Sequence, residues 1–188
     1  MCSSDLVDTA AGRRTLDLAV DAAGTLVAAT VDMGAVIDDA AAIPTTADPT
    51  TGITAEVDGV TYAGDAVGMG NPHWVLVVED PATARLADHG PVLEHDPRFP
   101  NRTNVEFIAP TPGEADAITM RVWERGVGET RSCGTGACAA AAVAHRRGLV
   151  GTRVTVHVPG GDLTVDLGPT VRLTGPVVET ATHPLEVA

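Results

Sequence analysis

Alternating apolar and polar residues dominate this chain and predict a protein built mainly from β-strands. The strand patterns cover residues 14–20, 24–34, 53–70, 74–80, 104–110, 118–126, 153–168 and 171–182. Turn signals predict that residues 14–34 form a hairpin-like pair, and that further hairpins turn at Asp58-Gly59 and at Pro159-Gly160-Gly161. The run WVLVVED at 74–80 is continuously apolar at its start, which is typical of a strand buried on both faces.

Two segments depart from this pattern and predict helices. Residues 82–96 are expected to form a short helix, a break at Pro91 and then a helix or a loop. Residues 137–147 are rich in alanine and are followed by Gly148, a residue that commonly follows a helix. Glycines at 134 and 136 allow a tight turn just before this helix, so we expect Cys133 at its amino terminus or one residue earlier.

Composition narrows the range of partners. The 188 residues suffice for one ordinary domain, and the net charge of −13 argues against nucleic acid or an anionic membrane surface as a partner. No run of about 18 apolar residues is present, so no membrane span is expected. All 12 basic residues are arginine, and without lysine no Schiff base can form with pyridoxal phosphate. This excludes covalent pyridoxal phosphate chemistry and leaves a small-molecule partner open. The odd number of cysteines, 3, fits a reducing cytoplasm.

Cys133 is the most informative single residue. A helix amino terminus offers unpaired backbone N–H groups and the positive end of the helix dipole. Both favour a thiolate, so the pKa of Cys133 is expected to be lowered, and the same N–H groups would hold a carboxylate. The alternative is that Cys133 is a small buried apolar residue at a tight helix start. Cys138 lies inside the alanine run and is expected to belong to the core.

Other uses of this segment have less support. A phosphate-binding loop of the P-loop type needs a lysine, which the chain lacks. Cys133 and Cys138 do not have the spacing of a zinc knuckle, and we expect no metal site. A cysteine hydrolase needs a histidine beside the thiol, and the sequence alone places none of the 6 histidines there.

Three motifs in the same order resemble those of diaminopimelate epimerases. ERGVGETRSCGTGACAAA at 124–141 resembles the second cysteine motif of that family. GMGNPHWVLVVED at 68–80 and RFPNRTNVEFI at 98–108 resemble two further family segments, and residues 154–167 and 171–177 resemble its closing strands. The resemblance runs from about Asp32 to the end of the chain.

This resemblance implies an α+β fold, in which a mixed, mostly antiparallel sheet curls around a central helix in each of two similar lobes. It implies an isomerase of lysine and peptidoglycan biosynthesis that interconverts LL- and meso-diaminopimelate without a cofactor. Two cysteines, one from each lobe, face opposite sides of the substrate Cα. One removes a proton and the other delivers one.

The resemblance also assigns roles to individual residues. It implies catalytic roles for Cys133, Glu124 and His73. It implies substrate contacts for Asn71, Asn104, Glu124, Arg125, Gly134 and Thr135. The N–H groups of the last two would hold the α-carboxylate, Glu124 suits the ammonium, and Arg125 suits a carboxylate. From the residues alone, Asn71 and Asn104 would be turn and loop residues, and His73 a partly buried polar residue.

The first part of the chain departs from the family pattern. The family's first motif, Met-Cys-Gly-Asn-Gly, should lie well upstream of residue 32, whereas this chain begins MCSSDLVDT. We expect residues 1–6 to be foreign to the fold and residues 1–32 to be a remnant of the first lobe. Residues 33–175 would form the second lobe, and residues 176–188 a tail strand returning to the first. Because inversion needs a proton donor on the opposite face, we expect this chain alone to be inactive.

Two rival interpretations stay open at this stage. One is another isomerase of the same superfamily, such as a proline racemase or a phenazine-biosynthesis-type isomerase. The other is a non-catalytic domain that binds an amino-acid carboxylate at the helix start. The resemblance also allows a homodimer as the working assembly.

Overall fold

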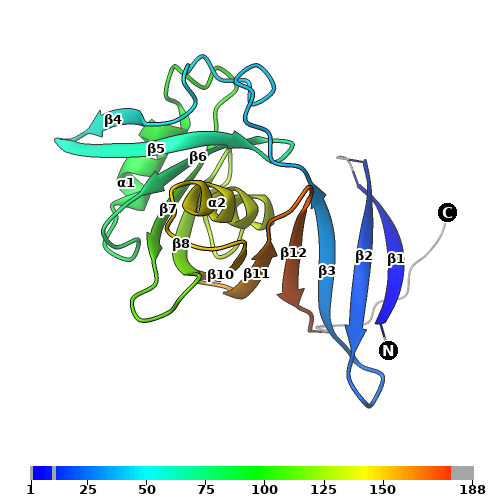
Figure 1. Cartoon of the computed structure of the whole chain (residues 1–188). Coiled ribbons are helices and arrows are strands. Elements are labelled where there is room, and N and C mark those ends of the chain that lie inside the picture. Colours follow the sequence, from blue (N-terminus) through cyan, green and yellow to red (C-terminus); the bar gives the residue numbers. More distant parts are fainter. Residues whose placement is uncertain (1, 10–11, 179–188) are drawn as a thin grey trace.

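A computed structural model of the chain describes residues 2–9 and 12–178 (Figure 1). Its strands are β1 (Cys2–Thr9), β2 (Gly12–Val20), β3 (Leu26–Gly34), β4 (Ile53–Val57), β5 (Val60–Gly68), β6 (Pro72–Val77), β7 (Asn104–Pro110), β8 (Ala117–Glu124), β9 (Gly128–Thr130), β10 (Arg153–Val158), β11 (Gly161–Asp166) and β12 (Val171–Pro176). Its helices are α1 (Leu86–Glu94) and α2 (Gly134–Arg146). No helix in the described ranges is long and apolar enough to cross a membrane.

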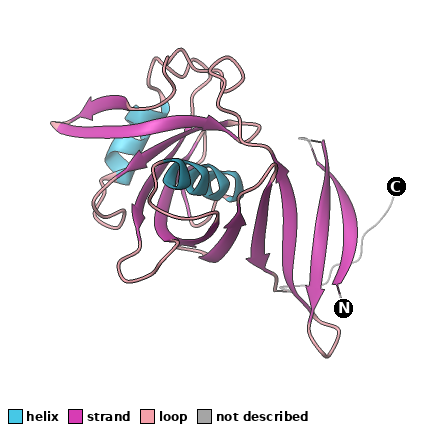
Figure 2. Ribbon diagram, viewed as in Figure 1, coloured by secondary structure: helices cyan, strands magenta, loops and turns pink. Residues whose placement is uncertain are grey.

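The strands form one sheet in the order β1-β2-β3-β12-β11-β10-β8-β7-β6-β5-β4, and β9 pairs with β8 at the side. Most neighbours are antiparallel, but β6 and β7 are parallel, as are β8 and β10. Figure 2 shows that the part from β5 to β11 curls around α2, whereas β1, β2 and β3 extend away from the helix. The predicted fold, a mixed and mostly antiparallel sheet curled around a central helix, is confirmed.

The alanines of α2 let the helix lie inside the curl of the sheet. Five of them are fully buried, and small side chains allow the surrounding strands to approach the helix closely. The strands contribute the larger apolar residues of this core: Val75, Ile108, Ile118, Met120, Val122, Val154, Val156 and Val165. A helix this rich in alanine is therefore held by packing on all sides rather than by one apolar stripe.

A second core lies on the other face of β6 and β7. Successive residues of a strand point to opposite faces of the sheet. Val75 accordingly faces α2, whereas Trp74 and Leu76 join Phe107 and the leucines of α1 in the second cluster. This explains why residues 74–77 are continuously apolar, as the sequence predicted.

The local turn predictions are confirmed. β2 and β3 form a hairpin, and β4 and β5 are joined at Asp58 and Gly59, which both have positive φ angles (50° and 75°). Such angles suit a tight two-residue hairpin turn. The hairpin of β10 and β11 turns between Val158 and Gly161, and Gly148 follows α2 with a φ of 71°.

Other predictions need correction. Pro91 does not break the helix, because α1 runs through it. Leu86 and Leu93, on either side of Pro91, are both buried, and Gly90 lies against the Trp123 ring, so tertiary packing outweighs the lost backbone hydrogen bond. The helix α2 also begins at Gly134, earlier than residue 137.

The ends of the chain differ from expectation in part. Residues 2–6 pair with residues 15–19 of β2, and the foreign origin expected for residues 1–6 stays a prediction. Of the predicted strand at 171–182, residues 171–176 form β12, which pairs with β3. Residues 179–188, most of the proposed tail strand, lie outside the described part. The division into lobes stays a prediction.

Candidate active site

The site is built around the amino terminus of α2. Cys133 is the N-cap of this helix and has an extended backbone (φ −136°, ψ 112°), as the sequence predicted. Its sulfur accepts a hydrogen bond from the amide of Gly136, with a donor–acceptor distance of 3.3 Å. A thiol here takes the place of the hydroxyl or carboxylate that usually caps a helix.

Two backbone amides beside the sulfur remain available for a ligand. The Ala137 amide bonds the Cys133 carbonyl oxygen at 2.9 Å, and the Gly136 amide bonds the sulfur. The amides of Gly134 and Thr135 have no hydrogen-bond acceptor among the described residues. Because unpaired amides at a helix start attract anions, this geometry matches the carboxylate-binding role expected for these two residues.

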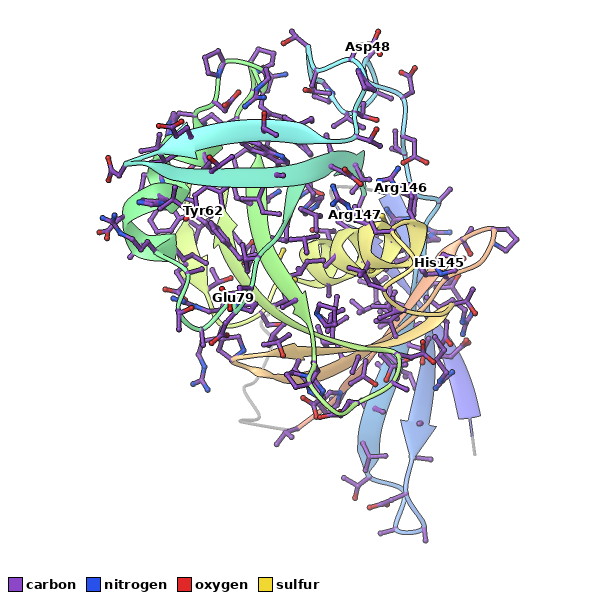
Figure 3. All side chains as sticks on the ribbon, turned by 60° about the vertical axis from the view of Figure 1, so that its left-hand side comes forward. Asp48, Tyr62, Glu79, His145, Arg146 and Arg147 are labelled. Atoms are coloured by element: carbon purple, nitrogen blue, oxygen red, sulfur yellow. The ribbon has the colours of Figure 1, made fainter. Side chains whose placement is uncertain are left out.

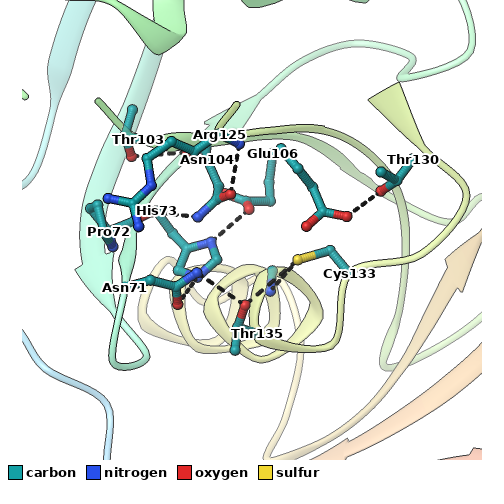
Figure 4. Close-up of polar contacts among 12 residues, drawn as sticks. Asn71, Pro72, His73, Thr103, Asn104, Glu106, Arg125, Thr130, Cys133 and Thr135 are labelled. Carbon is teal, nitrogen blue, oxygen red and sulfur yellow. Dashed lines mark hydrogen bonds and ion pairs between the residues drawn. The ribbon is translucent and has the colours of Figure 1, made fainter. Parts of the chain in front are cut away.

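Asn71, His73 and Glu106 join the strands to the start of α2 (Figure 4). The Nδ1 atom of His73 lies 2.7 Å from Oε1 of Glu106, and Nε2 lies 2.9 Å from Oδ1 of Asn71. The Nδ2 atom of Asn71 lies 3.5 Å from Oγ1 of Thr135, which in turn lies 3.6 Å from the Cys133 sulfur. A continuous line of polar contacts therefore leads from a buried carboxyl to the thiol.

Asn104 and Arg125 hold the adjacent backbone. The Nδ2 atom of Asn104 donates to the Pro72 carbonyl oxygen at 2.9 Å, and its Oδ1 accepts from the Arg125 amide at 2.9 Å. The Arg125 guanidinium donates to the Asn101 carbonyl oxygen at 3.2 Å. Both polar atoms of Asn104 already bond the protein, so the geometry gives this residue a positioning role. Its substrate contact stays a prediction.

Glu124 is the last residue of β8 and lies partly exposed beside the thiol. Its Oε1 accepts a hydrogen bond of 2.5 Å from the Thr130 hydroxyl, and its negative charge raises the pKa of the Cys133 thiol. The described structure thus gathers Asn71, His73, Arg125, Cys133 and Thr135 near the start of α2 (Figure 4), where Gly134 is the first helical residue and Glu124 acts on the thiol through its charge. The roles expected for these residues stay predictions.

The expected lowering of the Cys133 pKa is wrong for the chain as it stands. Cys133 is only 7% exposed. Burial raises the pKa of its thiol to about 12, with a further rise from the negative charges of Glu106 and Glu124, despite hydrogen bonds from Thr135 and Gly136. The cost of desolvating a thiolate exceeds the stabilisation from these two donors. Cys133 is therefore a protonated thiol in this state.

Sequence reasoning missed Glu106. Its side chain is fully buried in β7, and burial raises the pKa of its carboxyl. Its Oε2 atom has no hydrogen-bond partner among the described residues. The signal was present in the sequence, since NVEFIAP places one acid in an otherwise apolar strand. Such a residue is costly to bury without a purpose.

Gly136 is required by this arrangement. A Cβ atom at this position would lie 2.8 Å from Oε1 of Glu106 and 3.2 Å from the Cys133 sulfur. Only glycine lets the first turn of α2 approach the buried carboxyl so closely. Cys138 is fully buried, as expected for a core residue.

No other described feature competes as a centre for this chemistry. The described residues contain no cluster of three or more His, Cys, Asp or Glu side chains that could hold a metal ion. A cavity of about 500 Å³ lies by β5 and residues 77–85, where Tyr62 and Glu79 line it (Figure 3). None of the site residues predicted from the sequence lines this cavity.

Comparison with known proteins gives a consistent family. The model of the diaminopimelate epimerase family matches residues 65–178. A diaminopimelate epimerase from Moorella thermoacetica is 49% identical over 154 residues, which cover 79% of this chain and 54% of that protein. One from Desulfitobacterium hafniense is 45% identical over 175 residues, which cover 90% of this chain and 60% of that protein. The chain thus spans little more than half the length of these relatives.

Solved structures share the fold at much lower identity. A hydroxyproline epimerase from Agrobacterium vitis superposes with a TM-score of 0.69 at 19% identity, covering 93% of this chain and 56% of that one. A probable proline racemase from Agrobacterium radiobacter K84 gives a TM-score of 0.68 at 17% identity, covering 93% of this chain and 58% of that one. At this identity the likeness concerns the fold alone.

Proposed function

This chain belongs to the diaminopimelate epimerase family, and we propose that it supplies one half of the catalytic site of a cofactor-independent isomerase acting on LL- and meso-diaminopimelate. The observation that carries the proposal is the start of α2. There the Cys133 thiol caps the helix, the amides of Gly134 and Thr135 have no acceptor among the described residues, and the Glu124 carboxylate acts on the thiol through its charge. This set suits an amino acid whose Cα is to gain or lose a proton.

The amides would hold the substrate α-carboxylate at the helix start. That contact also stabilises the negative charge that develops on the carboxylate side when the Cα proton leaves. Glu124 would bind the α-ammonium, and Arg125 a carboxylate, since its guanidinium uses one nitrogen for Asn101. Contacts from the two amides, from Glu124 and from Arg125 would orient the substrate so that one face of its Cα lies against the sulfur.

Cys133 would act on that face as a general acid or base. In the described state burial raises its pKa to about 12, so the sulfur holds the proton that a general acid would deliver. Acting as the base requires the opposite state, a thiolate supported by the Thr135 hydroxyl and the Gly136 amide. Which isomer meets the thiolate is set by the geometry of the bound substrate.

Inversion needs a second group on the other face of the Cα. Cys138 is also a free cysteine, but it is fully buried within α2. We propose that residues 33–175 form one lobe of the family fold and that the opposing acid or base belongs to the other lobe. The chain alone would then have negligible epimerase activity.

The test uses purified chain and LL-diaminopimelate in deuterated water. We expect binding by calorimetry, tighter than for plain carboxylates, with deuterium entering at Cα only slowly and without formation of the meso isomer. Cys133→Ala should abolish the deuterium incorporation, and Cys138→Ala, the matched control, should keep it. Sustained conversion to the meso isomer would refute the division between lobes. The absence of both diaminopimelate binding and deuterium exchange would refute the proposed function.

A non-catalytic carboxylate-binding domain is the second candidate. It is favoured by the raised pKa of Cys133, because at neutral pH the free chain then contains very little thiolate that could act as a base. Binding of diaminopimelate without any Cα exchange, unchanged by Cys133→Ala, would support this candidate.

The compartment and the assembly follow from the same chemistry. Acid–base catalysis needs the reduced thiol, and Cys133 and Cys138 are free, so we place the reaction in the reducing cytoplasm. A second copy of the protein is the proposed partner beyond the substrate, and sedimentation at increasing concentration tests it.

A further inference from the structure

Glu106 is an acid in the middle of an apolar strand. It lies between Val105 and Phe107, and its neighbours across the sheet are Val75 and Val122. The side chain is fully buried, and its Oε2 atom has no hydrogen-bond partner among the described residues. Burying a carboxyl costs free energy unless it is hydrogen-bonded, so the hydrogen bond that offsets the burial of Glu106 must be made by its Oε1 atom.

That oxygen lies 2.7 Å from Nδ1 of His73, whose Nε2 lies 2.9 Å from Oδ1 of Asn71. An amide oxygen only accepts hydrogen bonds, so in this orientation Nε2 of His73 carries a proton. One further proton must lie between Nδ1 and the carboxyl, because two lone pairs would repel each other at this distance. The pair of Glu106 and His73 then has no net charge, whichever of the two holds that proton.

The next two contacts lead from Asn71 through Thr135 to the Cys133 sulfur. Asn71 donates through Nδ2 to Oγ1 of Thr135 at 3.5 Å. A hydroxyl that accepts in this way keeps its hydrogen for another acceptor, and the Cys133 sulfur lies 3.6 Å away. From Nε2 of His73 onward, each donor along these contacts then points toward the sulfur. Figure 4 draws the contacts.

Loss of the shared proton would reverse this order. The Glu106 carboxylate would then accept from Nδ1 of His73, and Nε2 would become an acceptor. Asn71 would have to turn its amide around, and Thr135 would donate to Asn71 instead of to the sulfur. The pair would also become negative beside the thiol. Both changes favour the thiol of Cys133 over the thiolate.

We propose that Glu106 is a positioning residue for Cys133. By sharing one proton with His73, it sets the direction of the hydrogen-bond chain so that the Thr135 hydroxyl donates to the sulfur. This inference rests on the acid–base role proposed above for Cys133.

Among the described residues, four titratable groups act on the sulfur directly or belong to the hydrogen-bond chain that leads to it. They are His73 of β6, Glu106 of β7, Glu124 of β8 and Cys138 of α2. Only the first two belong to the hydrogen-bond chain. Glu124 bonds Thr130 and acts on the sulfur through its charge.

The first test compares Glu106→Gln with Glu94→Gln. Glu94 is a matched control, because it is also buried and hydrogen-bonded, but its side-chain partners are Trp123, Gly126 and Arg102, away from the sulfur. A glutamine at 106 can donate from its amide to Nδ1 of His73 and can never become negative. Alkylation of Cys133 by iodoacetamide, followed by mass spectrometry of its peptide, is measured from pH 6 to 11. The imidazole ¹⁵N shifts of His73 report its tautomer.

We expect Glu106→Gln to keep the proton on Nε2 of His73 at every pH. At pH values where the pair of Glu106 and His73 keeps its shared proton, Glu106→Gln should be alkylated at the rate of the unaltered chain. Above the pH at which the pair loses that proton, Glu106→Gln should be alkylated faster by about tenfold. Glu94→Gln should match the unaltered chain. Equal alkylation profiles and equal His73 tautomers in both variants would overturn the proposal.

A second pair of variants avoids the buried core. Thr135 is partly exposed, so Thr135→Val and Thr135→Ser should both fold. Valine removes the donor and should slow alkylation of Cys133, whereas serine should preserve the rate. Equal rates in the two variants would also overturn the proposal. No substrate is present in these measurements, so a failed epimerase assay leaves their outcome intact.

Discussion

Gly136 offers a sharp test of the packing at the start of α2. Helix propensity alone predicts that Gly136→Ala stabilises the protein by about 1 kcal/mol. The structure predicts the opposite sign. The new Cβ atom would lie 2.8 Å from Oε1 of Glu106 and 3.2 Å from the Cys133 sulfur, both inside ordinary van der Waals contact.

Neither neighbour can move without loss. Glu106 is fully buried and bonded to His73 at 2.7 Å, and the Cys133 sulfur is bonded to the amide of residue 136 itself. Overpacking of a rigid interior costs about 1–3 kcal/mol, and so short a contact with a fixed polar atom belongs in the upper part of that range. After the propensity gain is subtracted, the net loss of unfolding free energy should be about 1–2 kcal/mol.

Urea unfolding at pH 7 measures this difference, with Gly134→Ala as the matched control. A Cβ at residue 134 would meet only the end of the Leu173 side chain, at 3.0 Å, and leucine can turn aside. We expect the control to change stability by no more than about 0.5 kcal/mol. Stabilisation by Gly136→Ala would refute the described packing of Glu106 against the helix start.

The remaining predictions concern pH. Because burial raises the pKa of Cys133 to about 12, the alkylation rate of the folded chain should keep rising about tenfold per pH unit beyond pH 9. The chain unfolded in urea should instead reach a plateau near pH 9, and the same plateau in the folded chain would contradict the prediction. The same shift means that the buried thiol contributes stability that is fully present below pH 9 and is lost as the pH rises toward 12; Cys133→Ala should therefore reduce the fall in stability measured between pH 9 and 11. Burial alone would raise the pKa of Asp65, but hydrogen bonds from Arg147 and from the Gly52 amide hold it below its usual value, so its contribution is present at neutral pH and lost as the pH falls through that lowered pKa. Asp65→Asn should lower stability at pH 7 by about 2 kcal/mol and flatten the acid limb of the urea-unfolding profile, and a parallel profile would contradict the ion pair.

Local signals in the sequence predicted local structure well. Asp58-Gly59 predicts a hairpin because its backbone tolerates positive φ, and the structure has both residues there. The small residues around Cys133 predict a helix start, and the cysteine is the N-cap. Both features depend on a few adjacent residues and are therefore legible in one stretch of chain.

Predictions failed where distant segments decide the outcome. Pro91 should end a helix, but α1 continues because its buried leucines pack against strands far away in sequence. The register of β6 against β7 places His73 opposite Asn104, two residues before Glu106, and no local pattern specifies that pairing. Glu106 was missed because its partner comes from another strand.

Family motifs and adjacent residues were enough to predict the curled α+β sheet and the position of Cys133 at the start of α2. The protonation state of the sulfur depends on contacts that form only in the folded protein. A helix start favours a thiolate through groups within the next few residues, whereas desolvation depends on every segment that surrounds the atom. Strands β7 and β8 bring apolar side chains and two carboxyls to Cys133, and these distant contributions outweigh the local donors.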